Sequence, residues 1–132
     1  MSERIPEDER MTPAEFRCVI EYLGLTQSDA AALLEVAPRT VRHWIEGKYV
    51  IPDGVREALE RGEARTADAV GHLVAALNDA AHVGVIVYRS DADMWAARPE
   101  MKPWPARWWR HVVMRAATEV PGVEIDYENG AS

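Results

Sequence analysis

Residues 26–48 read TQSDAAALLEVAPRTVRHWIEGK, and this stretch decides how the N-terminal half of the chain folds. Thr26 is a favourable N-cap, because its hydroxyl can accept a hydrogen bond from a free backbone N–H at the start of an alanine-rich helix over 27–34. Pro38 suits the first turn of a second helix, and Gly47 suits its end. The stretch therefore predicts two short helices joined by a tight turn.

The spacing of small and apolar residues within this stretch is that of a helix-turn-helix. Ala31 is small enough to let the two helices cross closely, and Val36 is the apolar residue of the turn. Val41 and Trp44 lie three residues apart, which places both on the inner face of the second helix. The opposite face is then free to enter a groove of DNA.

From Met11 to Leu59 the chain resembles the Cro and lambda-repressor-like (Xre) helix-turn-helix family, most clearly in residues 26–48 and the IPDGV segment that follows them. In that family the glutamine that opens the second helix and residues after the third helix hold the DNA backbone, while outward residues of the third helix read the major groove. The resemblance implies a candidate set of DNA-contacting residues: Gln27, Pro38, Arg39, Thr40, Arg42, His43 and Lys48.

Three residues depart from the pattern of that family. Glu35 stands where a turn glycine is usual, and a left-handed backbone there costs a residue with a side chain roughly 1 kcal/mol. Ala37 replaces the usual capping serine, and Ile45 replaces the glutamate that commonly follows the tryptophan. We therefore expect the turn to differ in detail from that of the family.

The same kinds of signal extend over the rest of the chain. Thr12, Pro13 and Glu15 form a capping box with proline at the first helical position. β-Branched and aromatic residues at 83–88 and apolar alternation at 123–127 predict two strands, which pair with each other or with a copy in another subunit. The predicted helices are 13–23, 27–34, 38–46, 54–61, 66–81, 91–97 (capped by Asp91) and 106–119, with a rigid loop over 99–105.

These elements predict an α+β, mainly α architecture with an N-terminal lambda-repressor-like helix-turn-helix bundle and a small C-terminal α/β dimerisation lobe. We expect a flexible lead-in over 1–11, a DNA-binding domain over 12–65, and a linking helix with a dimerisation domain over 66–132. A chain of 132 residues has room for about one domain, or for two small lobes.

The net charge limits how this chain can bind nucleic acid. Its 15 basic and 22 acidic residues give a formal charge of −7, which argues against indiscriminate coating of DNA or of an anionic membrane. Residues 37–48 nevertheless hold three basic side chains, Arg39, Arg42 and Lys48, against the single acid Glu46. One bidentate arginine contact to guanine discriminates by about 1 to 3 kcal/mol. We therefore expect sequence-specific binding with modest nonspecific affinity and a dependence on dimerisation.

Other chemistries find little support in the sequence. Cys18, the single cysteine, has no partner for a disulfide or a zinc site, and its place on an apolar helix predicts burial. His72, His82 and His111 lie on separate elements, so we expect no metal, no cofactor and no catalytic residue. The lack of a membrane-spanning apolar run and of a signal segment predicts a cytoplasmic protein.

Four of the five tryptophans lie within the fifteen residues 95–109. They fit one compact core around the two strands, the anchoring of a symmetric dimer, or both, which we favour because aromatic residues are enriched at interface cores. Stacking of exposed rings on single-stranded nucleic acid is a third explanation, but basic residues are sparse beside them. The candidate dimer-interface residues are Trp95, Trp104, Trp108, Trp109, Val123 and Ile125.

The order of WIEGKYVIPDGV, a linking helix, VIVYRSDADMWAARPE and a tryptophan-containing last helix resembles the YdiL-like group of small helix-turn-helix proteins. That group includes repressors associated with anti-CRISPR operons, which implies dimers that form through the C-terminal half, bind inverted repeats and regulate their own operon. We expect a homodimeric transcriptional repressor that binds double-stranded DNA. The half-sites of its operator would lie about one helical turn, or a multiple of it, apart. The alternatives are an antitoxin that neutralises a toxin through its second lobe, and a protein-interaction adaptor that no longer binds DNA.

Overall fold

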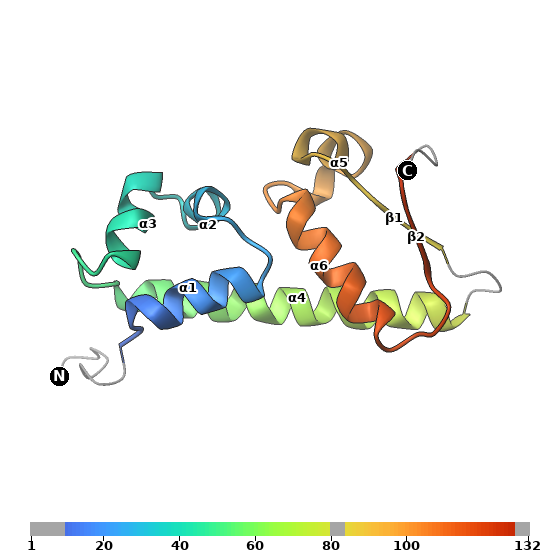
Figure 1. Cartoon of the computed structure of the whole chain (residues 1–132), viewed down its shortest axis with the longest axis horizontal. Coiled ribbons are helices and arrows are strands. Elements are labelled where there is room, and N and C mark those ends of the chain that lie inside the picture. The colour runs from blue at the N-terminus through green and yellow to red at the C-terminus, as the bar shows by residue number, and fades with distance from the viewer. Residues whose placement is uncertain (1–9, 80–83, 129–132) are drawn as a thin grey trace. The chain divides into compact units, whose positions relative to one another are not determined.

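The computed structural model describes residues 10–79 and 84–128 of the chain (Figure 1). The described part is mainly helical with one two-stranded sheet, in agreement with the predicted α+β, mainly α class. Residues 1–9 of the lead-in predicted over 1–11, the helix end beyond residue 79, His82 and Val83 lie outside the described residues. In chain order the elements are α1 (Pro13–Tyr22), α2 (Gln27–Leu34), α3 (Pro38–Ile45), α4 (Asp53–Asp79), β1 (Gly84–Val87), α5 (Asp91–Ala97), the 3-10 helix η2 (Pro99–Met101), α6 (Ala106–Ala117) and β2 (Glu124–Tyr127).

The chain separates into two compact units, Met1–Glu63 and Ala64–Ser132. The boundary between them falls inside α4, so that the first part of this helix belongs to the N-terminal unit and the rest to the C-terminal unit.

The prediction of two helices over 54–61 and 66–81 is wrong, because α4 is a single helix through this region. Gly62 is the weakest helix former at the predicted break. A glycine inside a helix costs only about 1 kcal/mol relative to alanine, and alanine, glutamate and arginine on either side favour the helix. Thr66 is correspondingly not at a helix start: it is buried, and its hydroxyl oxygen accepts a hydrogen bond from the Trp108 indole at 3.0 Å.

Two capping boxes fix the starts of α1 and α2, as the threonines at these positions predict. The hydroxyls of Thr12 and Thr26 accept hydrogen bonds from the backbone N–H groups of Glu15 and Asp29, and each of these carboxylates accepts one from the threonine N–H in return. The N–H of Thr12 is the main cause that lowers the pKa of Glu15 below its ordinary value of 4.5, and the Thr12 hydroxyl and the charge of Arg56 act in the same direction.

The core of the N-terminal unit is apolar and centres on an edge-to-face contact between Phe16 and Trp44, whose ring centroids lie 5.6 Å apart. Burial of Cys18 is a wrong prediction, since this side chain is exposed. The buried stripe of α1 runs through Phe16 and Ile20, and a residue two positions after Phe16 points away from it. The buried apolar residues of this unit are Phe16, Ile20, Leu23, Leu25, Ala30, Ala31, Val41, Trp44, Ile51, Val55 and Leu59.

In the C-terminal unit β1 and β2 pair in parallel, with Val85 opposite Ile125 and Val87 opposite Tyr127. Parallel neighbours need a long crossover, which α5, η2 and α6 supply (Figure 1). The face of α6 that is buried carries two tryptophans and two valines among small residues: Ala106, Trp108, Trp109, Val112, Val113 and Ala116.

Asp91 does not cap the helix that it begins. Ser90 does so instead, because its hydroxyl oxygen accepts from the backbone N–H of Asp93 at 3.1 Å. The Asp91 carboxylate accepts from the backbone N–H of Ala106 at 2.8 Å, and it thereby satisfies a free donor at the start of α6. This bond ties α5 to α6 within the C-terminal unit.

Candidate nucleic-acid interface

A short turn joins α2 to α3. Glu35 adopts the left-handed conformation, with φ 57° and ψ 43°, although glutamate carries a Cβ that disfavours it. The backbone N–H of Val36 bonds to the carbonyl of Ala31 at 3.0 Å and so closes the end of α2. Ala37 gives α3 no side-chain cap, as the missing serine predicts, and Pro38 occupies the first turn. The turn conformation typical of glycine is therefore present without a glycine.

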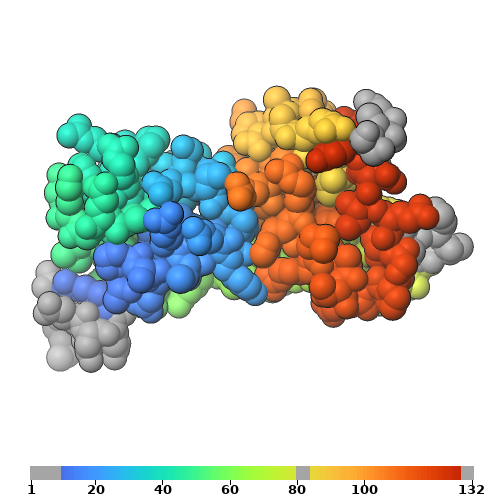
Figure 2. All heavy atoms as spheres, viewed as in Figure 1, coloured from blue at the N-terminus to red at the C-terminus, as the bar shows by residue number. Residues whose placement is uncertain are grey.

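The inner face of α3 is fixed by Val41 and Trp44, which are almost completely buried. The rest of the helix lies on the surface of its unit (Figure 2). Among the residues predicted to contact DNA, the exposed ones are Pro38, Arg39, Arg42 and Lys48, and the half-buried ones are Gln27, Thr40 and His43. Since α2 and α3 pack against each other, the structure brings these residues onto two adjoining elements and the loop that follows α3.

The basic groups of this surface differ in their partners. Neither Arg39 nor Arg42 forms a hydrogen bond or ion pair through its guanidinium with another residue in the described part of the chain. Lys48 lies 3.6 Å from the carboxylate of Glu46, and both side chains are largely exposed. An exposed pair of this kind is worth about 1 kcal/mol or less, so the ammonium can exchange Glu46 for a phosphate at small cost.

Tyr49 extends this surface, and the sequence analysis did not single it out. Its ring meets the His43 ring edge-on, with centroids 4.8 Å apart, while 57% of the residue stays exposed. Val50 beside it is 68% exposed. An aromatic residue directly after Gly47 and Lys48 was the available signal, but its contact with His43 depends on how the loop folds back toward α3.

The candidate dimer-interface tryptophans divide into two groups. Trp108 and Trp109 are 1% and 6% exposed, and their indole N–H groups donate to the Thr66 hydroxyl and to the backbone carbonyl of Ile86, the latter at 2.8 Å. Trp95 and Trp104 are half-buried, and the Trp95 indole donates to the Trp104 carbonyl. The first pair thus fills the core of its own unit, as the compact-core explanation expects.

The apolar side chains left exposed in this unit lie elsewhere. Ile125 is 39% exposed and Met114 is 55% exposed, and both line a cavity of about 310 Å³ together with Val113 and Tyr127. Val123 is half-buried. Met114 was absent from the predicted interface, although it lies on the same helix as Trp108 and Trp109. A single methionine forms no sequence pattern that would indicate an interface.

The described residues 10–79 and 84–128 hold no group of three or more histidine, cysteine, aspartate or glutamate side chains that could bind a metal ion. Within the same ranges, no helix has both the length and the apolar character needed to cross a membrane.

Comparison with known proteins adds no family to this picture: no protein-family model matches the chain, and a search of the curated proteins finds no match.

Proposed function

We propose that the protein is a transcriptional repressor that binds double-stranded DNA sequence-specifically and uses α2 and α3 as a helix-turn-helix. One observation carries the proposal: α3 is anchored from within by Val41 and Trp44, while Arg39 and Arg42 on its other side have no partner among the described residues. A helix with side chains is about 10–12 Å across, which matches the width of about 12 Å of the major groove.

Each residue of the surface has a role in this proposal. Arg39, in the first turn of α3, donates to the O6 and N7 acceptors of a guanine, and Thr40 and His43 contact neighbouring bases. Gln27 at the start of α2 and Lys48 after α3 hold phosphates on either side of the groove. Arg42 on the flank reaches a phosphate or a base.

The protein acts as a homodimer on an inverted repeat in this proposal, with the C-terminal unit as the dimerisation unit. Exposed Met114 and Ile125 supply apolar surface for the contact. Glu124 and Asp126 alternate with Ile125 along β2, so joining β2 to its copy edge to edge would place acids near each other, which is unfavourable. The Met114 and Ile125 surface includes Asp126 as well, but Arg110 lines the same cavity and can offset the charge of this acid. Occupation of its own promoter then represses transcription.

The test begins with selection of bound DNA from random sequence by the full chain, followed by band shifts on the enriched site and a scrambled one. We expect Arg39→Ala to lose about 1 to 3 kcal/mol of preference for the enriched site. Lys48→Ala should weaken binding to both DNAs alike and reduce the salt slope by about 1. Arg61→Ala, which removes an exposed arginine of α4, is the matched control and should change neither.

Failure to enrich any sequence would refute the proposal and favour the adaptor alternative. Uniform weakening by Arg39→Ala on both DNAs would instead reassign this residue from base reading to phosphate contact.

A further inference from the structure

The C-terminal unit contains an open cavity of about 650 Å³ whose walls come from α4, β1 and the segment around η2, with Trp108 and Trp109 of α6 among its lining residues. Sites for small molecules are mostly apolar concavities of about 300–1,000 Å³ with a few polar groups that converge on them. This cavity has that size, and its polar groups fall into two sets.

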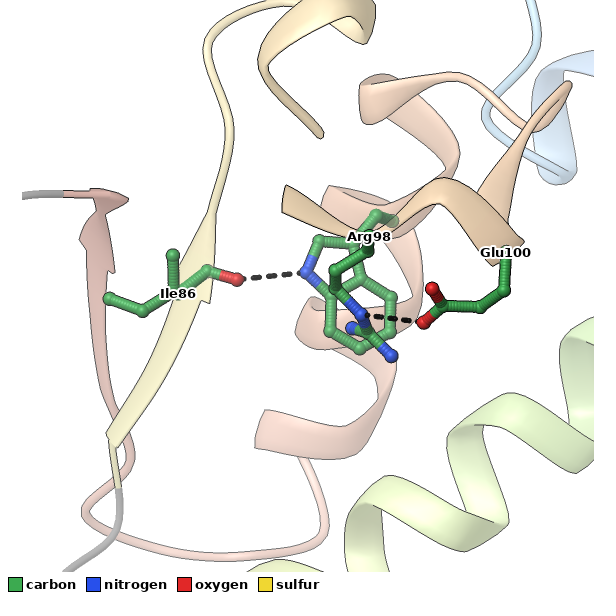
Figure 3. A network of polar contacts seen from close by, with 4 residues as sticks. Ile86, Arg98 and Glu100 are labelled. Atoms are coloured by element: carbon green, nitrogen blue, oxygen red, sulfur yellow. Dashed lines mark hydrogen bonds and ion pairs between the residues drawn. The ribbon is translucent and has the colours of Figure 1, made fainter. Parts of the chain in front are cut away.

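Arg98 forms the first set with its neighbours. Its guanidinium carbon lies 4.8 Å from the centre of the Trp109 ring, and its Nε lies 3.3 Å from the Glu100 carboxylate (Figure 3). The Trp109 indole is itself held by its hydrogen bond to the carbonyl of Ile86. The terminal nitrogens of Arg98 bind no other described residue. A guanidinium that is stacked and paired in this way is a preorganised receptor for a carboxylate.

The second set lies along one face of α4. Arg65 and Asp68, three residues apart, both line the cavity. The Arg65 guanidinium sits 5.6 and 6.0 Å from the centres of the Trp104 and Trp108 rings. The Asp68 carboxylate forms no hydrogen bond or ion pair with another residue of the described ranges. The Asp68 carboxylate, which can bind a cationic group, therefore faces the same cavity as the Arg98 guanidinium.

The charges of the lining balance, which narrows the class of ligand. Two arginines stand against Asp68 and Glu100, and Glu100 is already paired with Arg98. A simple anion would meet the unpaired Asp68, and a simple cation would meet Arg65. A ligand that carries both charges but no net charge satisfies both sets. Leu73 and Val85 also line the cavity and add apolar surface to that of the indole rings.

We propose that this cavity binds a small zwitterion with an apolar body, the chemical class of free amino acids with hydrophobic side chains. The carboxylate of the ligand binds the guanidinium fork of Arg98, and its ammonium group binds Asp68. The apolar body packs against Leu73, Val85 and the tryptophan rings. This binding activity lies within the C-terminal unit, goes beyond DNA recognition and does not depend on it.

Isothermal titration calorimetry of the full chain tests the proposal with L-phenylalanine as the probe. We expect saturable binding of one molecule per chain. Phenethylamine lacks the carboxylate, 3-phenylpropionate lacks the ammonium group and glycine lacks the apolar body. Each should bind at least about tenfold more weakly: the first two lose a hydrogen bond to a charged group, and glycine loses the burial of apolar surface. No binding of phenylalanine, or equal binding of 3-phenylpropionate, would overturn the proposal.

Variants locate the ligand within the unit. Asp68→Asn on the exposed face of α4 and Arg98→Lys, which keeps the charge but loses the planar fork, should each weaken phenylalanine binding about tenfold. Arg107→Ala removes an exposed arginine of α6 outside the cavity and should bind as the original chain does. Unchanged circular dichroism and melting temperature show that the variants are folded. Unchanged affinity in folded Asp68→Asn or Arg98→Lys would refute the assigned contacts.

Discussion

The left-handed Glu35 between α2 and α3 makes a specific prediction about stability: Glu35→Gly stabilises the protein. Glu35 has φ 57° and ψ 43° and is exposed, so its side chain makes no buried contact that the substitution would remove. Most substitutions by glycine destabilise proteins, because glycine gains more freedom on unfolding than any other residue. The sign of this change is therefore diagnostic of the backbone conformation.

The magnitude follows from three contributions. Release of the left-handed strain favours the variant by about 1 to 2 kcal/mol. The greater flexibility of glycine in the unfolded chain opposes this by about 0.5 to 1 kcal/mol. Removal of a carboxylate from the C-terminal end of α2, where the helix dipole is negative, adds about 0.3 to 1 kcal/mol. We expect a net gain of about 1 kcal/mol in the free energy of unfolding.

Urea unfolding followed by circular dichroism measures this gain, and two variants separate its causes. Glu35→Ala removes the charge but keeps the Cβ, so it should gain only the contribution of the helix dipole. Glu60→Gly, at an exposed position inside α4, should lose about 0.5 to 1 kcal/mol because the helix there needs no left-handed residue. If Glu35→Gly were instead less stable than Glu35→Ala by about 0.5 to 1 kcal/mol, the left-handed turn would be refuted, since only the flexibility cost of glycine would then remain.

Three further predictions concern other parts of the chain. Folding lowers the pKa of Glu15 below 4.5, so the stabilisation from its bond with Thr12 is present above pH 4.5 and is lost as the pH falls through the lowered value. In urea unfolding across this range, the stability of Glu15→Gln should therefore depend less on pH than that of the original chain. Parallel plots of stability against pH for the two proteins would contradict this prediction. Thr66→Val leaves the buried Trp108 N–H without its acceptor and should cost about 1 to 3 kcal/mol in thermal unfolding, whereas Thr66→Ser, which keeps the hydroxyl, should cost less; equal losses would argue against the hydrogen bond. Ile125→Asp should shift a dimer toward monomer in sedimentation equilibrium without unfolding it, and an unshifted dimer would place the contact elsewhere.

The helices around the turn were predictable because their signals are local. Thr26 and Pro38 act within one helical turn of their own positions, and the structure has α2 and α3 beginning where these residues predict. The continuity of α4 was missed for the opposite reason. Gly62 and the polar residues around it look like a break, and no feature within a few residues shows that Thr66 accepts the indole N–H of a residue 42 positions later.

The cavity lay beyond sequence reasoning for a similar reason. The residues of α4 that line the cavity can be assigned to one helix face only if 54–61 and 66–81 are joined into one helix. With two separate helices, Arg65 falls in the linker between them. The stacking of Arg98 on Trp109 also depends on the crossover between the parallel strands, which returns α6 toward β1. Periodicity can propose a helical face, but it does not say which side chain of another element stands opposite.

The position of the acids reconciles a chain of net charge −7 with the proposal of DNA binding. On the proposed DNA-contacting surface, Glu46 is already paired with Lys48, while Arg39 and Arg42 keep their guanidinium groups free of described partners. The N-terminal unit is itself acidic, with 8 basic against 13 acidic residues over 1–63, so the excess of basic side chains is confined to residues 37–48. An acidic chain gains little from phosphate attraction at long range, so its affinity has to come from groups that meet bases directly and from a second copy that doubles them. Acidity therefore disfavours binding to random DNA more strongly than binding to a matched inverted repeat.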